Sequence, residues 1–216
     1  MTQKLDYKKT ERALYLPPES PVEITVPPMR FIMVDGSGNP NDPEGEYQKA
    51  LELLYALTYT IKMGKDKPFG YVDYTVPPLE GLWWLNDGTD IDFSAKERYC
   101  WTSMIRQPEF VTDEVFAAAC AQVAVKKPHL DCAKARLAEF SEGLCVQMLH
   151  IGTYEDEPAS LAVMERYLCE RGLASDVGGT LPDGSKRRHH EIYLGDPRKV
   201  APERRKTVLR LPVRRA

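Results

Sequence analysis

Two stretches of the sequence, FIMVDGSGNPNDPEG (31–45) and VQMLHIGTYEDEPAS (146–160), follow the same order of residue types. Each begins with an apolar run typical of a strand, turns at glycine, passes through acidic residues and a proline, and leads into a helical pattern. In both cases two strand-like segments follow the helix. The sequence therefore predicts a strand-helix-strand-strand module that is used twice.

The helix after the first stretch carries the clearest periodic signal. Within residues 41–64 the apolar side chains recur at the three- and four-residue spacing of one helical face. They are Tyr47, Leu51, Leu54, Leu57 and Ile61. Asp42 is the expected N-cap, and Pro43 stands in the first turn, where proline is tolerated.

Proline and glycine punctuation places the remaining elements. Strand pieces are expected at 70–78, 79–85, 98–108, 143–152, 189–197 and 206–213, and helices at 111–127, 129–140 and 156–173. Gly172 stands where a glycine closes a helix. Module one then covers about 29–107, a helical bridge covers 108–141, and module two covers 142–216. We expect an α+β fold in which a pseudo-two-fold axis relates the modules and a ligand groove lies at their junction.

The first 28 residues differ from the rest in their proline content. Five prolines fall within this segment, and proline is excluded from helix interiors. They are Pro17, Pro18, Pro21, Pro27 and Pro28. We therefore expect residues 1–28 to lie across the surface as an extended N-terminal arm without a helix.

Composition indicates an ordinary globular protein. The chain has 216 residues, of which 43% are hydrophobic and 28% charged, and its formal net charge is −3. It lacks the positive excess of nucleic-acid-binding proteins, a membrane span and a secretory signal. Five widely spaced cysteines without a CxxC pair indicate reduced thiols. We expect a cytoplasmic monomer or homodimer that binds small molecules and uses no nucleic acid, membrane, metal or cofactor.

Two adjacent tryptophans in LEGLWWL (79–85) must point to opposite faces of a strand. Trp83 belongs to the more uniformly apolar set, which also contains Leu79 and Leu85. We therefore assign Trp83 to the core and Trp84 to an open sheet face that lines the groove.

The same alternation in HHEIYL (189–194) directs Ile192 to the core and turns Glu191 and Tyr193 toward the groove. A carboxylate held among aromatic rings loses solvation, and desolvation raises the pKa of a carboxyl group. Glu191 is thus a candidate acid/base group. The alternative is a solvated charge on an exposed sheet face.

Three segments, PPLEGLWW (77–84), LHIGTYEDEP (149–158) and HHEIYLGDPRKVAPERRKTVLRLPV (189–213), resemble the GyrI-like small-molecule-binding domain proteins. The resemblance begins near residue 4 and covers nearly the whole chain. Together with EGEYQKALELLYALTYTIKM (44–63), it is similar to the stand-alone bacterial members, whose characterised examples hydrolyse cyclopropanoid genotoxins. It implies a GyrI-like/SOUL-type fold with an aromatic-lined central groove.

The resemblance also implies roles for particular residues. Glu191, in the EIY element, is the first choice for the catalytic acid/base, and Glu157 is the second, although an acidic residue in a first helical turn is expected from the helix dipole alone. His150 is a candidate for orienting a water. The expected pocket wall, for each member of which core packing is the alternative, consists of Tyr71, Trp84, Trp101, Met148, Tyr154 and Tyr193.

Two functions are compatible with these features. One is the hydrolysis of flat, electrophilic small molecules, cyclopropanoid genotoxins among them, by addition of water. The alternative is a non-catalytic module that sequesters aromatic or cationic drugs, or a protein that acts like a gyrase inhibitor. Both functions would use the same groove.

Overall fold

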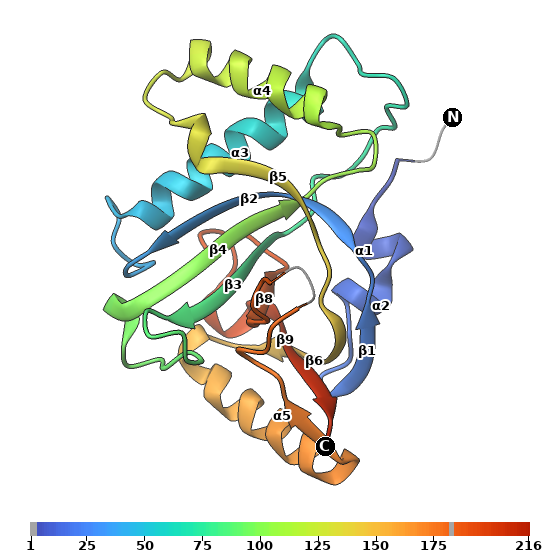
Figure 1. The fold of residues 1–216 in the computed structure, drawn as a ribbon, viewed down its shortest axis with the longest axis vertical. Helices are drawn as coiled ribbons and strands as arrows, with labels where there is room; N and C mark the ends of the chain where they lie inside the picture. Colours follow the sequence, from blue (N-terminus) through green and yellow to red (C-terminus); the bar gives the residue numbers. More distant parts are fainter. Residues whose placement is uncertain (1–3, 182–183) are drawn as a thin grey trace.

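The computed structural model describes residues 4–181 and 184–216 (Figure 1). Within these residues one sheet contains nine strands, and every pair of neighbouring strands is antiparallel. The strands are β1 (Val22–Val26), β2 (Met29–Ser37), β3 (Leu79–Leu85), β4 (Tyr99–Arg106), β5 (Ala135–Phe140), β6 (Gly143–Ile151), β7 (Leu173–Ser175), β8 (His189–Tyr193) and β9 (Lys206–Arg215). The α-helices are α1 (Tyr7–Thr10), α2 (Arg12–Tyr15), α3 (Glu46–Met63), α4 (Asp113–Lys126) and α5 (Glu157–Arg171). Among the described helices, none combines the length and apolar character that crossing a membrane requires.

The strand order reveals the duplicated module. The sheet runs β1-β6-β9-β8-β3-β4-β2-β5, with β7 paired to β9. Starting from the central β3–β8 pair, β4, β2 and β5 on one side mirror β9, β6 and β1 on the other. Each half has the chain order strand, helix, strand, strand: β2-α3-β3-β4 and β6-α5-β8-β9, with the short strand β7 between α5 and β8 in the second half. The expected pair of modules in an α+β fold is confirmed.

Both module helices pack on the same face of the sheet. The ring of Tyr47 in α3 lies 5.5 Å from that of Trp83, and Met164 in α5 packs in a cluster with Leu209. Trp83 and Leu209 belong to one face because their strands are linked through the pairs Gly81–Glu191 and Glu191–Leu209, and paired residues point the same way. In Figure 1, α3 lies over one half of the sheet with α4 beyond it, and α5 lies over the other half.

The opposite face is covered by the N-terminal segment. Tyr7, Leu14 and Tyr15, from α1 and α2, form a buried cluster with Met104 and Ile192 of the sheet. The sequence-based expectation of an open second face is therefore wrong. A sheet with both faces apolar needs two covers, and here the chain supplies the second cover itself.

A buried polar network lies under this N-terminal cover. The two ring nitrogens of His190 are 3.0 Å from Oε2 of Glu80 and 2.9 Å from Oε2 of Glu142. Arg210 donates from Nη1 to Glu142 at 2.8 Å and from Nη2 to the carbonyl of Leu14 at 2.8 Å. The network thus ties the N-terminal segment to the centre of the sheet.

The expected extended arm of residues 1–28 is wrong for the described part of that segment. Two helical turns and strand β1 form there, and Asp6 caps α1 by accepting from the backbone N–H of Lys8 at 3.2 Å. The prolines begin only at Pro17, after both helical turns, so they do not prevent them.

Three local predictions also need correction. The helix expected at 129–140 does not form: Cys132–Lys134 make a 3-10 turn and Ala135–Phe140 form strand β5, paired with β2, because edge pairing outweighs the weak stability of a short helix. Residues 70–78 contain only an isolated bridge from Tyr74 to Leu5. Helix α3 begins at Glu46, and Asp42 instead closes a turn by accepting from the N–H of Glu44 at 3.0 Å.

Candidate active site

The central strand pair places an acidic residue between the two module helices. Glu191 of β8 lies opposite Gly81 of β3, and Tyr193 lies opposite Leu79. Because alternate residues share a face, Glu191, Tyr193 and Trp83 all point toward the side that carries α3 and α5. Glu191 is only 7% exposed.

A chain of hydrogen bonds holds the Glu191 carboxylate. Nε1 of Trp83 donates to the hydroxyl of Tyr193 at 2.9 Å, and that hydroxyl donates to Oε2 of Glu191 at 2.7 Å. Nε2 of His189 lies 3.2 Å from Oε1 of Glu191. Both carboxylate oxygens therefore have a partner.

Gly81 makes this approach possible. A Cβ at residue 81 would lie 2.6 Å from Nε1 of Trp83 and 3.4 Å from the hydroxyl of Tyr193. The first distance is shorter than carbon and nitrogen atoms tolerate. Only glycine therefore lets the indole and the phenol meet across strand β3.

Aromatic rings from three elements surround the carboxylate. Tyr47 of α3 and Tyr99 of β4 pack against Trp83 at centroid distances of 5.5 and 5.7 Å. Tyr154, in the 3-10 helix η3 (Tyr154–Asp156), meets Tyr193 edge-on at 6.0 Å. Burial raises the pKa of Tyr154 to about 12 and that of Tyr193 well above its usual range, so these phenols are neutral O–H donors near neutral pH.

A second carboxyl group faces the same cluster. Glu157, the first residue of α5, is 1% exposed, and its carboxyl is hydrogen-bonded to Thr207 of β9. Among the described residues, its Oε1 has no hydrogen-bond partner. Burial raises the pKa of Glu157 well above its usual range, and the negative charge of Glu191 raises it further. The buried Glu157 carboxyl is therefore the candidate proton carrier of this cluster.

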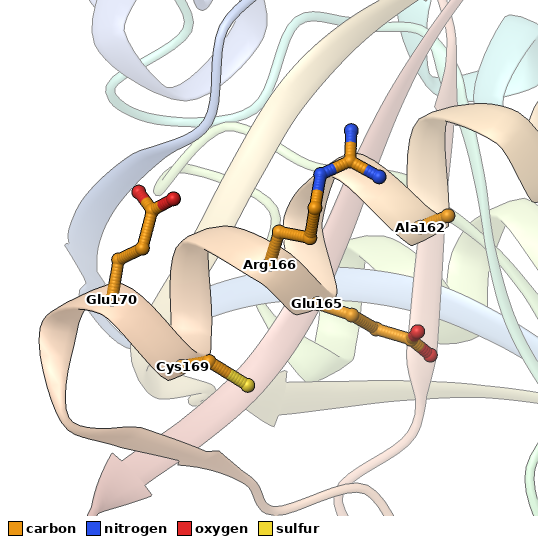
Figure 2. A pocket seen from close by; sticks show the side chains of 5 residues that line it. All are labelled: Ala162, Glu165, Arg166, Cys169 and Glu170. Carbon is orange, nitrogen blue, oxygen red and sulfur yellow. The ribbon is translucent and has the colours of Figure 1, made fainter.

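The cluster is nearly closed to solvent. Tyr154 and Tyr193 are its half-buried members, and Arg205 lies at its rim with its guanidinium 5.6 Å from the ring of Tyr154. A surface depression lies elsewhere, on the outer side of α5, where Figure 2 shows Glu165, Arg166 and Glu170 around it. Tyr154 and Tyr193 are therefore the aromatic members of the cluster that solvent reaches most.

The structure brings together four residues expected at the site: Glu191, Glu157, Tyr193 and Tyr154. Trp84 is not among them. It points to the opposite face, where it packs on the N-terminal side under the guanidinium of Arg188, 4.5 Å from its ring. The expectation that Trp84 lies on an open face beside Glu191 is wrong, because alternation along β3 places Trp83 on the side of Glu191 and the N-terminal segment packs near Trp84.

Three other expected residues have different surroundings, and a fourth, Trp101, is buried in the core behind Tyr47 of the cluster. Tyr71 packs with Tyr74 and Phe110, and Met148 lies in the core beneath α5. Trp101 is 1% exposed and packs against Tyr47. His150 uses both ring nitrogens within its own module, at 2.9 Å from the Ser160 hydroxyl and 2.9 Å from the Thr153 carbonyl, so neither is free to orient a water.

Sequence reasoning missed several residues of the cluster. The sequence pattern indicates only core positions for Trp83 and Tyr47, and it indicates no role for Tyr99 or His189. Parity on strand 189–194 was sufficient to place His189 beside Glu191, since the two are separated by one residue. No group of three or more His, Cys, Asp or Glu side chains suited to a metal ion occurs in residues 4–181 and 184–216.

The chain is similar in sequence and structure to several known proteins. The model of the GyrI-like small molecule binding domain matches residues 20–214. An uncharacterized conserved protein from Listeria innocua is 46% identical with a TM-score of 0.89, and the alignment covers 98% of this chain and 100% of that one. A hydrolase from Listeria innocua is 45% identical with a TM-score of 0.84 and the same coverage, 98% and 100%.

A more distant likeness concerns the fold alone. The EcmrR C-terminal domain is 9% identical with a TM-score of 0.53, and the alignment covers 91% of this chain and 98% of that domain. No curated protein sequence matches the chain.

Proposed function

This chain belongs to the family of GyrI-like small-molecule-binding domains, and from that premise we propose that it is a hydrolase. Its substrates are flat, electrophilic small molecules that carry a cyclopropane conjugated to a dienone. The enzyme adds water to the strained ring. It acts in the cytoplasm, where removal of the electrophile protects the cell. The hydrolase from Listeria innocua, at 45% identity, supports a hydrolytic reaction.

The observation that carries the proposal is the pair of buried carboxyl groups in an aromatic enclosure. Glu191 is held by hydrogen bonds, whereas burial and the charge of Glu191 raise the pKa of Glu157. Two carboxyl groups with different environments are the usual way to provide a base and an acid at one pH. A pair of this kind has no role in simple core packing.

The chemistry balances with these two groups. Glu191 takes a proton from water as the water oxygen bonds to a cyclopropane carbon. The ring C–C bond breaks, and its electron pair passes through the dienone to the carbonyl oxygen. Glu157 donates its proton to that oxygen, which becomes a phenol. A final proton transfer from Glu191 to Glu157, directly or through solvent, restores the starting state.

The aromatic residues supply the binding surface. Tyr47, Tyr99 and Tyr154 offer rings from three sides, which suits a flat ligand. Neutral phenols around the carboxylate also keep bulk water away from the reacting atoms, and a dry site strengthens every charge interaction within it.

The same cluster favours one other function. Aromatic rings that surround a carboxylate attract cationic ligands, so a module that sequesters aromatic cations is the second candidate. Incubation with a cyclopropanoid substrate distinguishes the two functions. A hydrolase gives a product heavier by one water, whereas a sequestering module returns the substrate unchanged.

Substitution Glu191→Gln tests the catalytic role. It keeps size and shape but removes the base, so we expect kcat/KM for a cyclopropanoid substrate to fall at least about 100-fold, the low end for loss of a general base. Binding of a neutral flat ligand should change little. Glu155→Gln is the matched control, because Glu155 lies just before α5 with an exposed side chain, 69% accessible. Steady-state turnover by the Glu191 variant within a few-fold of the parent would rule out this role.

A further inference from the structure

His189 is a buried residue that takes no direct part in the proposed reaction. It is the first residue of β8, is 0% exposed, and lies opposite Trp83 in the register of β3 and β8. Its Nε2 is 3.2 Å from Oε1 of Glu191. Its Nδ1 has no hydrogen-bond partner among the described residues. A buried imidazole with this geometry has one contact that can matter, and that contact is Glu191.

The unpartnered nitrogen decides the protonation of the ring. With a proton on Nε2 alone, the ring donates to Glu191 and leaves only a lone pair on Nδ1. With protons on both nitrogens, a charged N–H would be buried without an acceptor, which costs more. The geometry of His189 therefore makes Nε2 the nitrogen that donates toward Glu191.

The carboxyl groups of Glu191 and Glu157 differ in the number of hydrogen-bond donors around them. Glu191 accepts from His189 on one oxygen and from Tyr193 on the other, and such donors favour the ionised form. Among the described residues, Glu157 has the hydroxyl of Thr207 as a hydrogen-bond partner, and its Oε1 has none. The other groups that face Glu191 are phenols, those of Tyr47 on α3, Tyr99 on β4 and Tyr154 on η3.

We propose that His189 is a positioning residue that makes the two carboxyl groups unequal. By donating its Nε2–H to Glu191, it keeps Glu191 as the ionised base and leaves the shared proton on Glu157 as the acid. The assignment of Glu191 as the base and Glu157 as the acid rests on the proposed hydrolysis. The location of the proton does not, and it can be measured without any substrate.

Two substitutions separate this role from simple packing. His189→Met fills the buried space without an N–H donor, whereas His189→Gln returns an amide N–H near the former Nε2. With glutamate labelled by 13C at the side-chain carboxyl, titration by NMR reports which carboxyl carries the proton. In the parent at pH 7 we expect Glu157 protonated and Glu191 ionised. In the Met variant the protonated fraction of Glu191 should rise several-fold, and in the Gln variant it should return toward the parent value.

Kinetics supply a second readout of the same change. For a cyclopropanoid substrate, the acid limb of the pH profile of kcat/KM should move to higher pH by at least about one unit in His189→Met, with KM within about threefold of the parent. His189→Gln should restore the limb. An upward shift of this limb by one pH unit corresponds to about a tenfold change in the acid dissociation constant of the group that must be ionised.

His190→Met is the matched control. His190 is equally buried on the same strand but points to the opposite face, so its loss should lower Tm and leave the location of the proton between Glu157 and Glu191 unchanged. Equal behaviour of His189→Met and His189→Gln, or a parent whose proton resides on Glu191, would overturn the proposal.

The parent protein provides a test that needs no variant. Its imidazole 15N shifts should show hydrogen on Nε2 of His189, and a ring with hydrogen on Nδ1 alone would contradict the proposal. A parent that shows the expected proton location but no turnover would reject the hydrolase and keep the role of His189.

Discussion

At the scale of single residues, three consecutive acidic side chains at the start of α5 do three different things. Glu155 is exposed and pairs with Lys96 at 3.3 Å. Asp156 accepts from the Thr153 hydroxyl at 2.7 Å and so completes a capping box. Glu157 turns inward. The helix dipole explains acidic residues at this end in general, but it does not explain a carboxyl that is buried next to another one.

The raised pKa of Glu157 makes the stability of the protein depend on pH. A carboxyl whose pKa is higher in the folded state than its usual 4.5 contributes fully below about pH 4.5, and the contribution is lost as pH rises through the folded value. We therefore expect Glu157→Gln to stabilise the protein relative to the parent at pH 8 and to have much less effect at pH 4. Urea unfolding at the two pH values measures the difference.

The same substitution should cost activity. A glutamine has no proton to donate to the developing phenol, so turnover of a cyclopropanoid substrate should fall about 100-fold or more. Glu155→Gln should change neither property. A Glu157→Gln variant whose stability relative to the parent is the same at both pH values would contradict the buried, protonated carboxyl.

At the scale of elements, strand β3 separates two functions by its alternation. Trp83 faces the carboxyl groups and Trp84 faces the N-terminal side, and Gly81 gives Trp83 room to reach Tyr193. The strand therefore carries the site on one face and the packing of the N-terminal segment on the other.

Substitution Gly81→Ala tests the role of this strand. The new Cβ meets Nε1 of Trp83 and must displace the indole, which breaks its bond to Tyr193. We expect a loss of about 1–3 kcal/mol of stability, as for other overpacked sites, and at least a tenfold loss of turnover per folded molecule. The comparison is Trp84→Ala, which should lose stability but retain turnover and ligand affinity per folded molecule. Normal turnover in Gly81→Ala, measured with the folded fraction known, would show that the Trp83–Tyr193 contact is dispensable.

At the scale of the whole molecule, a charged network holds the N-terminal segment on the sheet. Burial would raise the pKa of Glu142, but the charges of His190 and Arg210 outweigh it and lower that pKa to about 2. Burial would lower the pKa of His190, but the charge of Glu142 and its hydrogen bonds outweigh it and raise that pKa above its usual 6.5. A protonated His190 donates from Nδ1 to Glu142, and its Nε2 lies within ion-pair distance, 3.0 Å, of Oε2 of Glu80.

These pKa shifts predict the pH range in which the N-terminal segment packs most stably on the sheet. The contribution of Glu142 is present above its usual pKa of 4.5 and is lost as pH falls toward about 2. The contribution of His190 is complete below pH 6.5 and is lost as pH rises through its folded pKa. We therefore expect amide-exchange protection of residues 7–15, corrected for the intrinsic rate, to be highest between about pH 4.5 and 6.5. Uniform protection from pH 4 to pH 9 would contradict this.

The sequence alone determined the two modules and the chemistry available to them. Periodic apolar residues and turn residues are local signals, so the strand-helix-strand-strand order, the end of α5 at Gly172 and the shared face of Glu191 and Tyr193 could all be predicted. The tertiary structure decided what covers each face. Alternation sorts side chains into two sets, but it does not say which distant element packs on each set, and Glu80, Glu142, His190 and Arg210 meet from separate parts of the chain. For that reason Trp83, and not Trp84, stands beside Glu191, and only folding brings Glu157 to it.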